Sequence, residues 1–451
     1  MIKVITYGTY DLLHYGHIRL LQRAKALGDY LIVGVTAEDF DKVRGKINVK
    51  QSLMERIEAV RATGIADEII VEEYEGQKID DIKRYDVDIF TVGSDWVGKF
   101  DYLNEFCKVI YLERTEGVSS SEIRAQSRNT KVGLLGDVTA AHVLEKYITE
   151  SSYVNGMEIT GICSIPREKD TTLTTHGIAM TEKYEDLLES VDAVYILSHP
   201  TCHYRDIKAA LLADKHVLCE SPIALTKKEC NELFGLAKER NLILMESIKT
   251  AYSTAYNRLL LLAKSGRIGT VISVDATCTS LRDIDISDAE IFNLTWNSIC
   301  SWGPTAMLPV FQLLGTSFTE KQVSSLILDQ TENFDLFTKI NFTYPNAVAS
   351  IKVGKGVKAE GELVIAGTKG YIYVPAPWWK TDYFEIRYEH TENNKRYFYQ
   401  LDGEGIRYEI VAFIKSIESG KQNTYINYGV TEAISSVLED FYAGKDVIKM
   451  Q

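Results

Sequence analysis

The chain opens on a strand and a turn that read IKVITYGTYDLLHYGH over residues 2–17. The first six of these residues are mostly apolar or β-branched and lead into Gly8, a pattern typical of a buried parallel strand that ends in a turn. Residues 17–28 then carry leucine and alanine at helical spacing and end at Gly28. A strand that enters a helix through a glycine-bearing turn predicts an α/β fold.

Further strand-like runs lie at residues 30–35, 68–73, 88–93 and 108–113, with helical stretches between the earlier ones. This alternation predicts an N-terminal α/β domain with a parallel sheet over residues 1–126. The polar segment at 124–130 contains no apolar run, and we expect the domain boundary there.

The alternation of strand and helix then starts again and later gives way to a different pattern. Strand-like runs at 131–137, 158–164, 193–198, 216–220 and 242–246 predict a second, doubly wound domain over residues 131–250. Longer strand-like runs follow at 270–279, 347–354, 361–367 and 383–390. They predict a C-terminal α+β domain over 251–451, with a mostly antiparallel open sheet and few helices. An amphipathic stretch at 430–444 predicts a closing helix that packs back on the doubly wound domain.

Composition narrows the class of protein. The 451 residues include 63 acidic and 50 basic side chains, and the net charge of -13 disfavours nucleic acid or an anionic membrane as a partner. The seven cysteines are odd in number and form no C-x-x-C pair, which indicates reduced thiols. No apolar run approaches the ~18 residues of a membrane span, and no signal-peptide block precedes Asp11. We therefore expect a cytoplasmic protein with no nucleic-acid and no membrane partner.

Two histidines, His14 and His17, lie three residues apart at the predicted start of the first helix. The free backbone N–H groups and the dipole of a helix N-terminus favour an anion, and imidazoles there can donate to phosphate oxygens. Gly16 lets a phosphate approach the backbone without a Cβ in the way. This arrangement suits a reaction that spreads negative charge over phosphoryl oxygens. The alternative is a pair of ordinary surface histidines.

A second turn suited to anions follows the strand-like run at 108–113 and reads RTEGVSSSEIR over residues 114–124. Arg114 lies just beyond the strand, and the hydroxyls of Ser119–Ser121 can cap a helix or reach phosphate. A capped helix in a solvated loop is the alternative interpretation. Because open α/β sheets bind ligands at the carboxyl ends of their strands, we expect this turn and the His14–His17 turn to converge on a triphosphate.

Several motifs occur in one order: GTYDLLHYGH, VRGKINV at 43–49, Arg56, GSDWVGKFDYL at 93–103 and RTEGVSSS. Together they resemble the glycerol-3-phosphate cytidylyltransferases. The resemblance implies an enzyme that transfers CMP from CTP, accompanied by Mg²⁺, to a small phosphorylated polyol. The products are a CDP-alditol and pyrophosphate. The attacking phosphate oxygen is already an anion, so no general base is expected.

The resemblance also implies the residues of this site. The catalytic ones are His14, His17, Lys46 and Arg114. The nucleotide-binding ones are Thr9, Tyr10, Asp11, Gly16, Asp95, Arg114, Thr115, Ser119 and Ser120. One departure concerns an arginine that the family carries downstream of Arg56, because Gly64 occupies its place. This leaves three acceptors open: glycerol 3-phosphate, an isomer, or a longer alditol phosphate. A different nucleotide or acceptor, such as ethanolamine phosphate or a heptose phosphate, is the alternative.

The second domain begins with KVGLLGDVTAAH over residues 131–142, a strand that enters a glycine turn. Gly133 and Gly136 are present, but Val138 occupies a usual glycine place of the dinucleotide fingerprint. The next strand ends in Ser164 instead of an acid, and Ser164 with Arg167 or Lys169 suits the 2′-phosphate of NADP. A plain strand–turn–helix and a simple polar loop are the alternatives.

Residues 192–226, 243–252 and 258–276 resemble the glucose–fructose oxidoreductase and inositol dehydrogenase family, and the likeness extends over 131–451. It implies a Rossmann domain that binds NADP or NAD, followed by an open-sheet substrate domain. The cofactor-binding residues that it implies are Gly133, Gly136, Ser164, Arg167, Ser198, His199, His203 and Glu220.

The catalytic residues of that family are missing. Where the family has a lysine between Glu and Pro, this chain has Glu220–Ser221–Pro222, and a serine cannot act as a near-neutral acid. The later family segment falls on residues 301–305, which lack the usual aspartate and histidine. Lys249 is the candidate catalytic residue of this second site, and a structural role is its alternative.

Three hypotheses account for the fusion of the two parts. In the first, the C-terminal part reduces a keto- or aldo-sugar phosphate to the alditol phosphate that the N-terminal part activates for teichoic acid or capsule polymers. In the second, it is an inactive relative that binds a ligand or builds an oligomer. In the third, it oxidises the nucleotide-activated product. Both families self-associate, so we expect a homo-oligomer.

Overall fold

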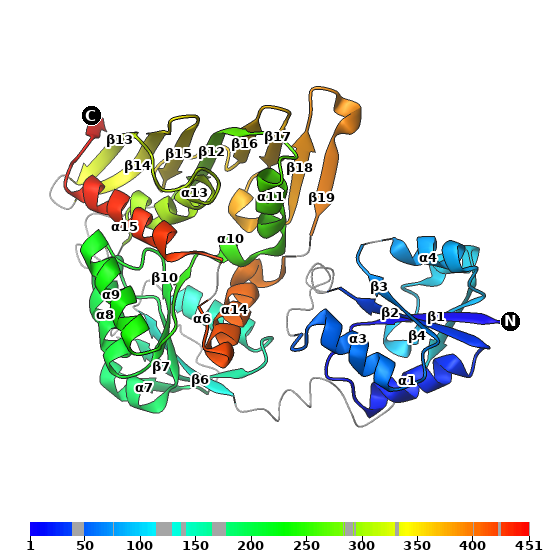
Figure 1. Cartoon of the computed structure of the whole chain (residues 1–451). Helices are drawn as coiled ribbons and strands as arrows, with labels where there is room; N and C mark the ends of the chain where they lie inside the picture. Colours follow the sequence, from blue (N-terminus) through cyan, green and yellow to red (C-terminus); the bar gives the residue numbers. More distant parts are fainter. Residues whose placement is uncertain are drawn as a thin grey trace. The chain divides into compact units, whose positions relative to one another are not determined.

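The computed structural model describes residues 1–37, 49–74, 76–113, 129–136, 141–164, 177–282, 284, 292, 295–329, 333–399, 401–422 and 425–450. The chain forms two compact units, Met1–Asn129 and Thr130–Gln451 (Figure 1). Each unit has its own sheets and its own buried core. Among the described helices, none has the length and hydropathy that crossing a bilayer requires.

The first unit is built on a five-stranded parallel sheet with the order β3-β2-β1-β4-β5 (Figure 1). Its strands are β1 Lys3–Gly8, β2 Tyr30–Thr36, β3 Glu68–Glu72, β4 Ile89–Gly93 and β5 Lys108–Leu112. Its helices are α1 Tyr15–Lys25, α3 Leu53–Ala62 and α4 Gln77–Tyr85. Alternate residues of β1 enter two different cores, Val4 with α1 and α3, and Ile5 with α4. Both faces of the sheet are thus covered, which confirms the predicted α/β class.

Helix α1 begins and ends earlier than its periodicity predicts. It begins at Tyr15 because His14 caps it, and it ends at Lys25. The chain then turns through Gly28 before β2. A Cβ on Gly28 would lie 2.6 Å from the carbonyl oxygen of Ile2, so only glycine lets the two backbones pass this closely.

The second unit begins with a parallel sheet of order β11-β10-β9-β6-β7-β8. Its strands are β6 Thr130–Gly136, β7 Met157–Ser164, β8 Ala179–Thr181, β9 Ala193–Ile196, β10 His216–Glu220 and β11 Leu244–Ser247. Its helices are α6 Ala141–Ser151, α7 Tyr184–Ser190, α8 Pro200–Leu212 and α9 Lys227–Glu239. The order reverses between β6 and β9, as in dinucleotide-binding folds, which confirms the predicted Rossmann-like part.

A nine-stranded mixed sheet of order β19-β18-β17-β16-β12-β15-β14-β13-β20 completes this unit. The strands are β12 Val271–Thr279, β13 Glu320–Asp329, β14 Phe334–Thr343, β15 Val348–Gly354, β16 Leu363–Gly367, β17 Tyr371–Val374, β18 Tyr383–Arg387, β19 Lys395–Phe398 and β20 Val447–Met450. The pairs β12–β15 and β13–β20 are parallel, and the other neighbouring strands pair antiparallel.

The expectation of few helices in this part was wrong. The helices are α10 Lys249–Tyr252, α11 Thr254–Lys264, α13 Ser298–Leu314, α14 Ile406–Ser419 and α15 Tyr428–Tyr442. Helix α13 packs against β12, β14 and β15 and is buried along most of its length. It contains Pro304 and Pro309, which count against a helix when only local propensity is considered.

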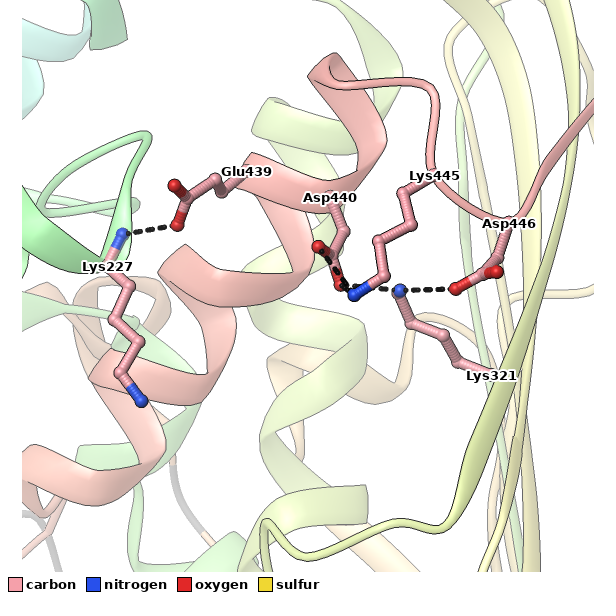
Figure 2. Close-up of polar contacts among 6 residues, drawn as sticks. All are labelled: Lys227, Lys321, Glu439, Asp440, Lys445 and Asp446. Atoms are coloured by element: carbon pink, nitrogen blue, oxygen red, sulfur yellow. Dashed lines mark hydrogen bonds and ion pairs between the residues drawn. The ribbon is translucent and has the colours of Figure 1, made fainter.

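Helix α15 joins the two parts of the second unit, as Figure 2 shows. It packs against α9 and α13, and the backbone N–H of Lys227 donates to Glu439 at 3.0 Å. At the next residue of the same helix end, Asp440, the buried ammonium group of Lys321, on β13, lies 2.6 Å from the carboxylate, and it lies 3.1 Å from Asp446. The predicted closing helix therefore links the mixed sheet to the dinucleotide fold.

Lys321→Met is expected to lower the free energy of unfolding of the second unit by about 2 kcal/mol, because it leaves two carboxylates without their shared cation. The effect stays below that of a fully buried pair because the Asp446 side chain is 48% exposed. Urea unfolding of the full chain measures it. Lys445→Met is the matched control: its side chain also reaches Asp440 but is 63% exposed, so a change of at most about 0.5 kcal/mol is expected. Equal losses in both variants would contradict the assignment.

Candidate functional site

The turn after β1 is tied to the residues that precede α3. Asp11 is buried, and its Oδ1 accepts hydrogen bonds from the backbone N–H groups of Lys50 and Gln51, both at 3.0 Å. The Gln51 side chain accepts in turn from the N–H of Leu12 at 2.7 Å. Asp11, predicted to lie near the nucleotide, therefore shapes the turn itself.

The Tyr10 side chain, predicted to bind the nucleotide, is buried in the core. Its side chain is 1% exposed and belongs to the core beneath α1 and α3. The ring packs against Gly8 and meets the His17 ring edge-on at 5.6 Å. Only the backbone of Tyr10, which is left-handed at φ 53°, is left to contact a nucleotide, so its side chain supports His17 instead.

His14 and His17 form a capping box at the N-terminus of α1. Nδ1 of His14 accepts from the N–H of Gly16 at 3.1 Å, and Nδ1 of His17 accepts from the N–H of His14 at 3.5 Å. The rings stack with centroids 3.9 Å apart. Because each Nδ1 is an acceptor, the proton of each neutral ring is on Nε2. The two half-buried histidines thus carry Nε2–H donors at a helix N-terminus.

Arg56 holds the strand ends beneath this turn. Its guanidinium is fully buried, and one nitrogen donates to the carbonyl oxygens of Thr9 and Thr36, each at 2.8 Å. Its Nε donates to the Gln51 carbonyl at 3.2 Å. Arg56 therefore fixes the ends of β1 and β2 and the start of α3 relative to one another.

Asp95 comes from the strand that neighbours β1. It lies in a single 3₁₀ turn, Ser94–Trp96, that directly follows β4. Since β1 and β4 are adjacent and parallel, Thr9, His14 and Asp95 all follow the same edge of the sheet. The other predicted residues of this site, Lys46, Arg114, Thr115, Ser119 and Ser120, lie outside the described residues.

The predicted cofactor residues of the second unit follow the carboxyl ends of its parallel strands. Gly136 ends β6, Ser164 ends β7, Ser198 and His199 follow β9, and Glu220 ends β10. Arg167 lies outside the described residues, so the predicted contact to a 2′-phosphate stays a prediction. His199 caps α8 through its Nδ1.

Gly133 and His203 pack or form hydrogen bonds inside the protein and do not face a cofactor site. A Cβ on Gly133 would lie 2.9 Å from Leu187, so this glycine makes room for α7. His203 is fully buried, and its two ring nitrogens lie 2.7 Å from the carbonyl oxygens of Ser198 and Pro222. Its predicted role as a cofactor ligand is therefore revised: it holds together the loops that follow β9 and β10.

Ser221, which occupies the position of the family's lysine, also points into the core. The Ser221 hydroxyl donates to Oε1 of Glu246, and the Thr431 hydroxyl donates to Oε2 at 2.6 Å. Glu246 is buried, and this burial raises the pKa of its carboxyl group. Ser221 thus satisfies a buried acid that links β11 to α15.

A cavity of about 350 Å³ lies between the parallel sheet and the mixed sheet of this unit. On one side it is lined by Glu220 and Lys249, whose charged atoms are 3.2 Å apart. Arg282, Trp302 and Lys355 line the other side. Lys249, the candidate catalytic residue of the second site, therefore lines this cavity, and its catalytic role stays a prediction. Arg282 and Lys355 were not predicted, because they follow strands of a different sheet and belong to no motif.

The same edge of the parallel sheet fits a nicotinamide cofactor. The first turn of α6 reaches the cavity through His142 and Val143, and Leu197 lines it from the loop after β9. This is the crevice at the reversal of strand order, where doubly wound sheets bind dinucleotides. Glu220 beside it accepts a hydrogen bond from the hydroxyl of Tyr195 and pairs with Lys249.

The first unit, with a histidine-capped helix on a five-stranded parallel sheet, has the features of a nucleotidyltransferase domain. The second unit, a dinucleotide fold joined to a mixed sheet, has those of an oxidoreductase-type domain. Residues 5–126 match the family described as Cytidylyltransferase-like, and residues 131–248 match the oxidoreductase family with an NAD-binding Rossmann fold. The chain belongs to the cytidylyltransferase family through its first unit and carries a domain of the oxidoreductase family after it.

Relatives of the first unit are similar over nearly their whole length. The glycerol-3-phosphate cytidylyltransferase of Bacillus spizizenii is 49% identical over 124 residues, which is 28% of this chain and 95% of that protein. The Staphylococcus aureus enzyme of the same name is 48% identical over 129 residues, with the same coverage. These likenesses confirm that the first unit is a nucleotidyltransferase.

The second unit is similar to reductases. A dTDP-3,4-didehydro-2,6-dideoxy-alpha-D-glucose 3-reductase of Streptomyces violaceoruber is 37% identical over 125 residues, 27% of this chain and 36% of that protein. The crystal structure of KijD10, a 3-ketoreductase from Actinomadura kijaniata in complex with NADP and TDP-benzene, has a TM-score of 0.62 at 19% identity. It covers 72% of this chain and all of KijD10, and it shows that the fold is shared.

Ser221→Ala is expected to lower the free energy of unfolding by about 1–3 kcal/mol, because it removes a hydroxyl donor from the buried Glu246. Thermal or urea unfolding of the full chain measures the change. The control is Ser273→Ala, which removes a hydroxyl that donates to an exposed carboxylate, Asp275, and should change stability by less than about 0.5 kcal/mol. A Ser221→Ala variant as stable as the wild type would refute the structural role of this serine.

Proposed function

We propose that this protein transfers CMP from CTP to glycerol 3-phosphate or a closely related alditol phosphate. The observation that carries the proposal is the capping box of His14 and His17, which places two Nε2–H donors at the N-terminus of α1, beside the carboxyl end of β1. Relatives that are 48–49% identical and named glycerol-3-phosphate cytidylyltransferases support CTP and this acceptor. The product class, CDP-alditols, feeds polymers of the teichoic acid or capsule type.

In the proposed reaction a phosphate oxygen of the acceptor attacks the α-phosphorus of CTP in line with the leaving group. The bond from this phosphorus to the bridging oxygen breaks, and pyrophosphate leaves with the bonding electrons. Mg²⁺ accompanies CTP and offsets part of its charge. His14 and His17 donate to the phosphoryl and leaving oxygens, where negative charge builds up in the transition state.

The remaining roles follow the family resemblance. Lys46, Arg114, Thr115, Ser119 and Ser120 are assigned to phosphate groups, and Asp95 to the base. Arg56 is a positioning residue: by holding the Thr9 carbonyl and the Gln51 carbonyl it keeps the histidine turn at the end of β1.

For the second unit, the proposal is a reduction that depends on a nicotinamide cofactor, NADP or NAD, and that supplies the acceptor. The cofactor would lie at the carboxyl edge of β6, β9 and β10, and the Glu220–Lys249 ion pair would face the substrate. The shared fold with a ketoreductase crystallised with NADP supports this proposal. The second candidate is an inactive domain that binds a ligand or builds an oligomer. Ser221 favours it, because this hydroxyl is committed to Glu246.

His17→Ala is expected to lower kcat/KM for pyrophosphate release at least about 30-fold, the equivalent of ~2 kcal/mol of lost transition-state stabilisation. Release of pyrophosphate from CTP and glycerol 3-phosphate is the measurement. His390→Ala serves as the control, because this histidine lies 79% exposed in the other unit. An unchanged rate for His17→Ala would remove the histidine turn from the site.

A panel of substrates tests the nucleotide and the acceptor directly. We expect pyrophosphate release with CTP far faster than with ATP, and with glycerol 3-phosphate or another alditol phosphate as acceptor. Ethanolamine phosphate and a heptose phosphate are the comparison acceptors, because they belong to the alternative assignment. Faster release with ATP, or with either comparison acceptor, would contradict the proposed function.

A further inference from the structure

Two cationic residues that no motif predicted lie side by side in the cavity of the second unit. Arg282 and Lys355 follow β12 and β15, which run parallel and end in register at Thr279 and Gly354. The backbone N–H of Arg282 donates to the carbonyl of Lys355 at 2.9 Å, so this pairing continues beyond the strands. Both side chains line the cavity.

The start of α13 holds Lys355 in place. Its backbone N–H donates to the hydroxyl of Ser298 at 3.0 Å, and its Nζ donates to the carbonyl of Trp296 at 2.6 Å. An ammonium group has three N–H donors, and within the described parts of the chain this carbonyl is the acceptor found for it. Ser301 and Trp302, in the first turns of α13, line the cavity beside it.

Two other lysines of this unit, Lys249 and Lys321, form ion pairs with acids, whereas Arg282 and Lys355 form none among the described residues. Lys249 lies 3.2 Å from Glu220, and Lys321 has Asp440 and Asp446. In the regions that the structure describes, neither Arg282 nor Lys355 forms an ion pair with a carboxylate. This side of the cavity therefore carries positive charge that an anionic ligand would neutralise.

The groups around Lys355 change the pKa of its ammonium group. Burial and the neighbouring Arg282 lower the pKa of its ammonium group to about 8, although the charges of Asp335 and Cys300 act in the opposite direction. Asp335 is fully buried and accepts from the N–H of Ile299 at 3.1 Å and from the hydroxyl of Thr338 at 2.6 Å. Burial raises the pKa of Asp335 to about 6 and that of Cys300 to about 12.

We propose that Arg282 and Lys355 bind the phosphate group of a small keto- or aldo-sugar phosphate, the substrate that the second unit reduces. A guanidinium fork beside an ammonium group is well suited to phosphate oxygens. The cavity, at about 350 Å³, lies within the range of ligand pockets and has room for a small phosphate monoester. This inference rests on the proposed reductase function of the same site.

The inference also orders the two reactions of the chain. A hydride from the reduced nicotinamide adds to the carbonyl carbon and a proton adds to the carbonyl oxygen, while the phosphate ester is unchanged. The alcohol that results is an alditol phosphate, the class of acceptor proposed for the first unit. Phosphorylation thus comes before reduction, and reduction comes before transfer of CMP.

Isothermal titration of the full chain, saturated with NADP⁺, tests the phosphate subsite with four probes: dihydroxyacetone phosphate, dihydroxyacetone, inorganic phosphate and CDP-glycerol. We expect dihydroxyacetone phosphate and phosphate to bind and dihydroxyacetone to bind at least about tenfold more weakly. Arg282→Ala and Lys355→Met should each abolish the binding of dihydroxyacetone phosphate and of inorganic phosphate at this subsite. Lys352→Met is the matched control, because this lysine is exposed on the same strand, β15.

The pH dependence of phosphate binding shows whether the Lys355 ammonium group contacts the phosphate. A bound phosphate raises the pKa of the adjacent ammonium group, so binding near pH 8 takes up protons and weakens as the pH rises above 8. Titrations in two buffers with different ionisation enthalpies measure this uptake. This uptake should be absent in Lys355→Met. It should also be absent in Lys355→Arg, because an arginine stays charged throughout this range. It should remain in the control variant Lys352→Met.

Three outcomes would overturn the proposal: equal binding by the variants and the wild type, equal binding of dihydroxyacetone with and without phosphate, or loss of CDP-glycerol binding alone. The last would mean that the nucleotide-activated compound is the ligand. Oxidation of NADPH or NADH, measured in parallel, separates this inference from the function on which it rests. Phosphate binding that both variants abolish, without oxidation by the wild type, would contradict the reductase and retain the subsite. Oxidation of NADPH or NADH at the wild-type rate in both variants would contradict the phosphate subsite and retain the reductase.

Discussion

The first unit depends on the buried guanidinium of Arg56. Removing a charge from water is costly unless hydrogen bonds compensate for it. Here three N–H groups of the guanidinium donate to the carbonyl oxygens of Thr9 after β1, Thr36 at the end of β2 and Gln51 before α3. The Thr9 carbonyl lies in the turn that leads to the histidine cap of α1, and Gln51 is hydrogen-bonded to Asp11 and Leu12 of the same turn. Arg56 therefore helps to position that cap. A lysine, with a smaller and more strongly hydrated charge, would not span the same three carbonyls.

The second unit shows how a family's chemistry can change while its fold persists. The position of the usual lysine holds Ser221, which is drawn into the core by Glu246. Positive charge is found instead on Lys249, Arg282 and Lys355, at the ends of strands from two different sheets. Next to the mixed sheet, the Trp296 carbonyl just before α13 and the Ser298 hydroxyl in its first turn hold Lys355.

In each unit the candidate site lies at the carboxyl edge of a parallel sheet, but it is built by different means. In the first unit the helix cap itself presents donors, because both histidine Nδ1 atoms are committed to backbone N–H groups. In the second unit the parallel sheet supplies one wall of a cavity, and the mixed sheet supplies the other. The second arrangement draws on residues far apart in the chain, which is why no single motif revealed it.

The sequence by itself determined the parallel sheets and placed His14 and His17 at the start of the first helix, because apolar runs, glycine turns and histidine spacing are local signals. The capping box of the two histidines was found only in the structure. The sequence patterns missed α13, whose prolines oppose a helix that tertiary burial nevertheless stabilises, and the short strand β8, which has no apolar run. Only the tertiary structure placed the Tyr10 and His203 side chains in the core and brought Arg282 beside Lys355. Such contacts join distant segments, and their direction depends on packing that no local pattern records.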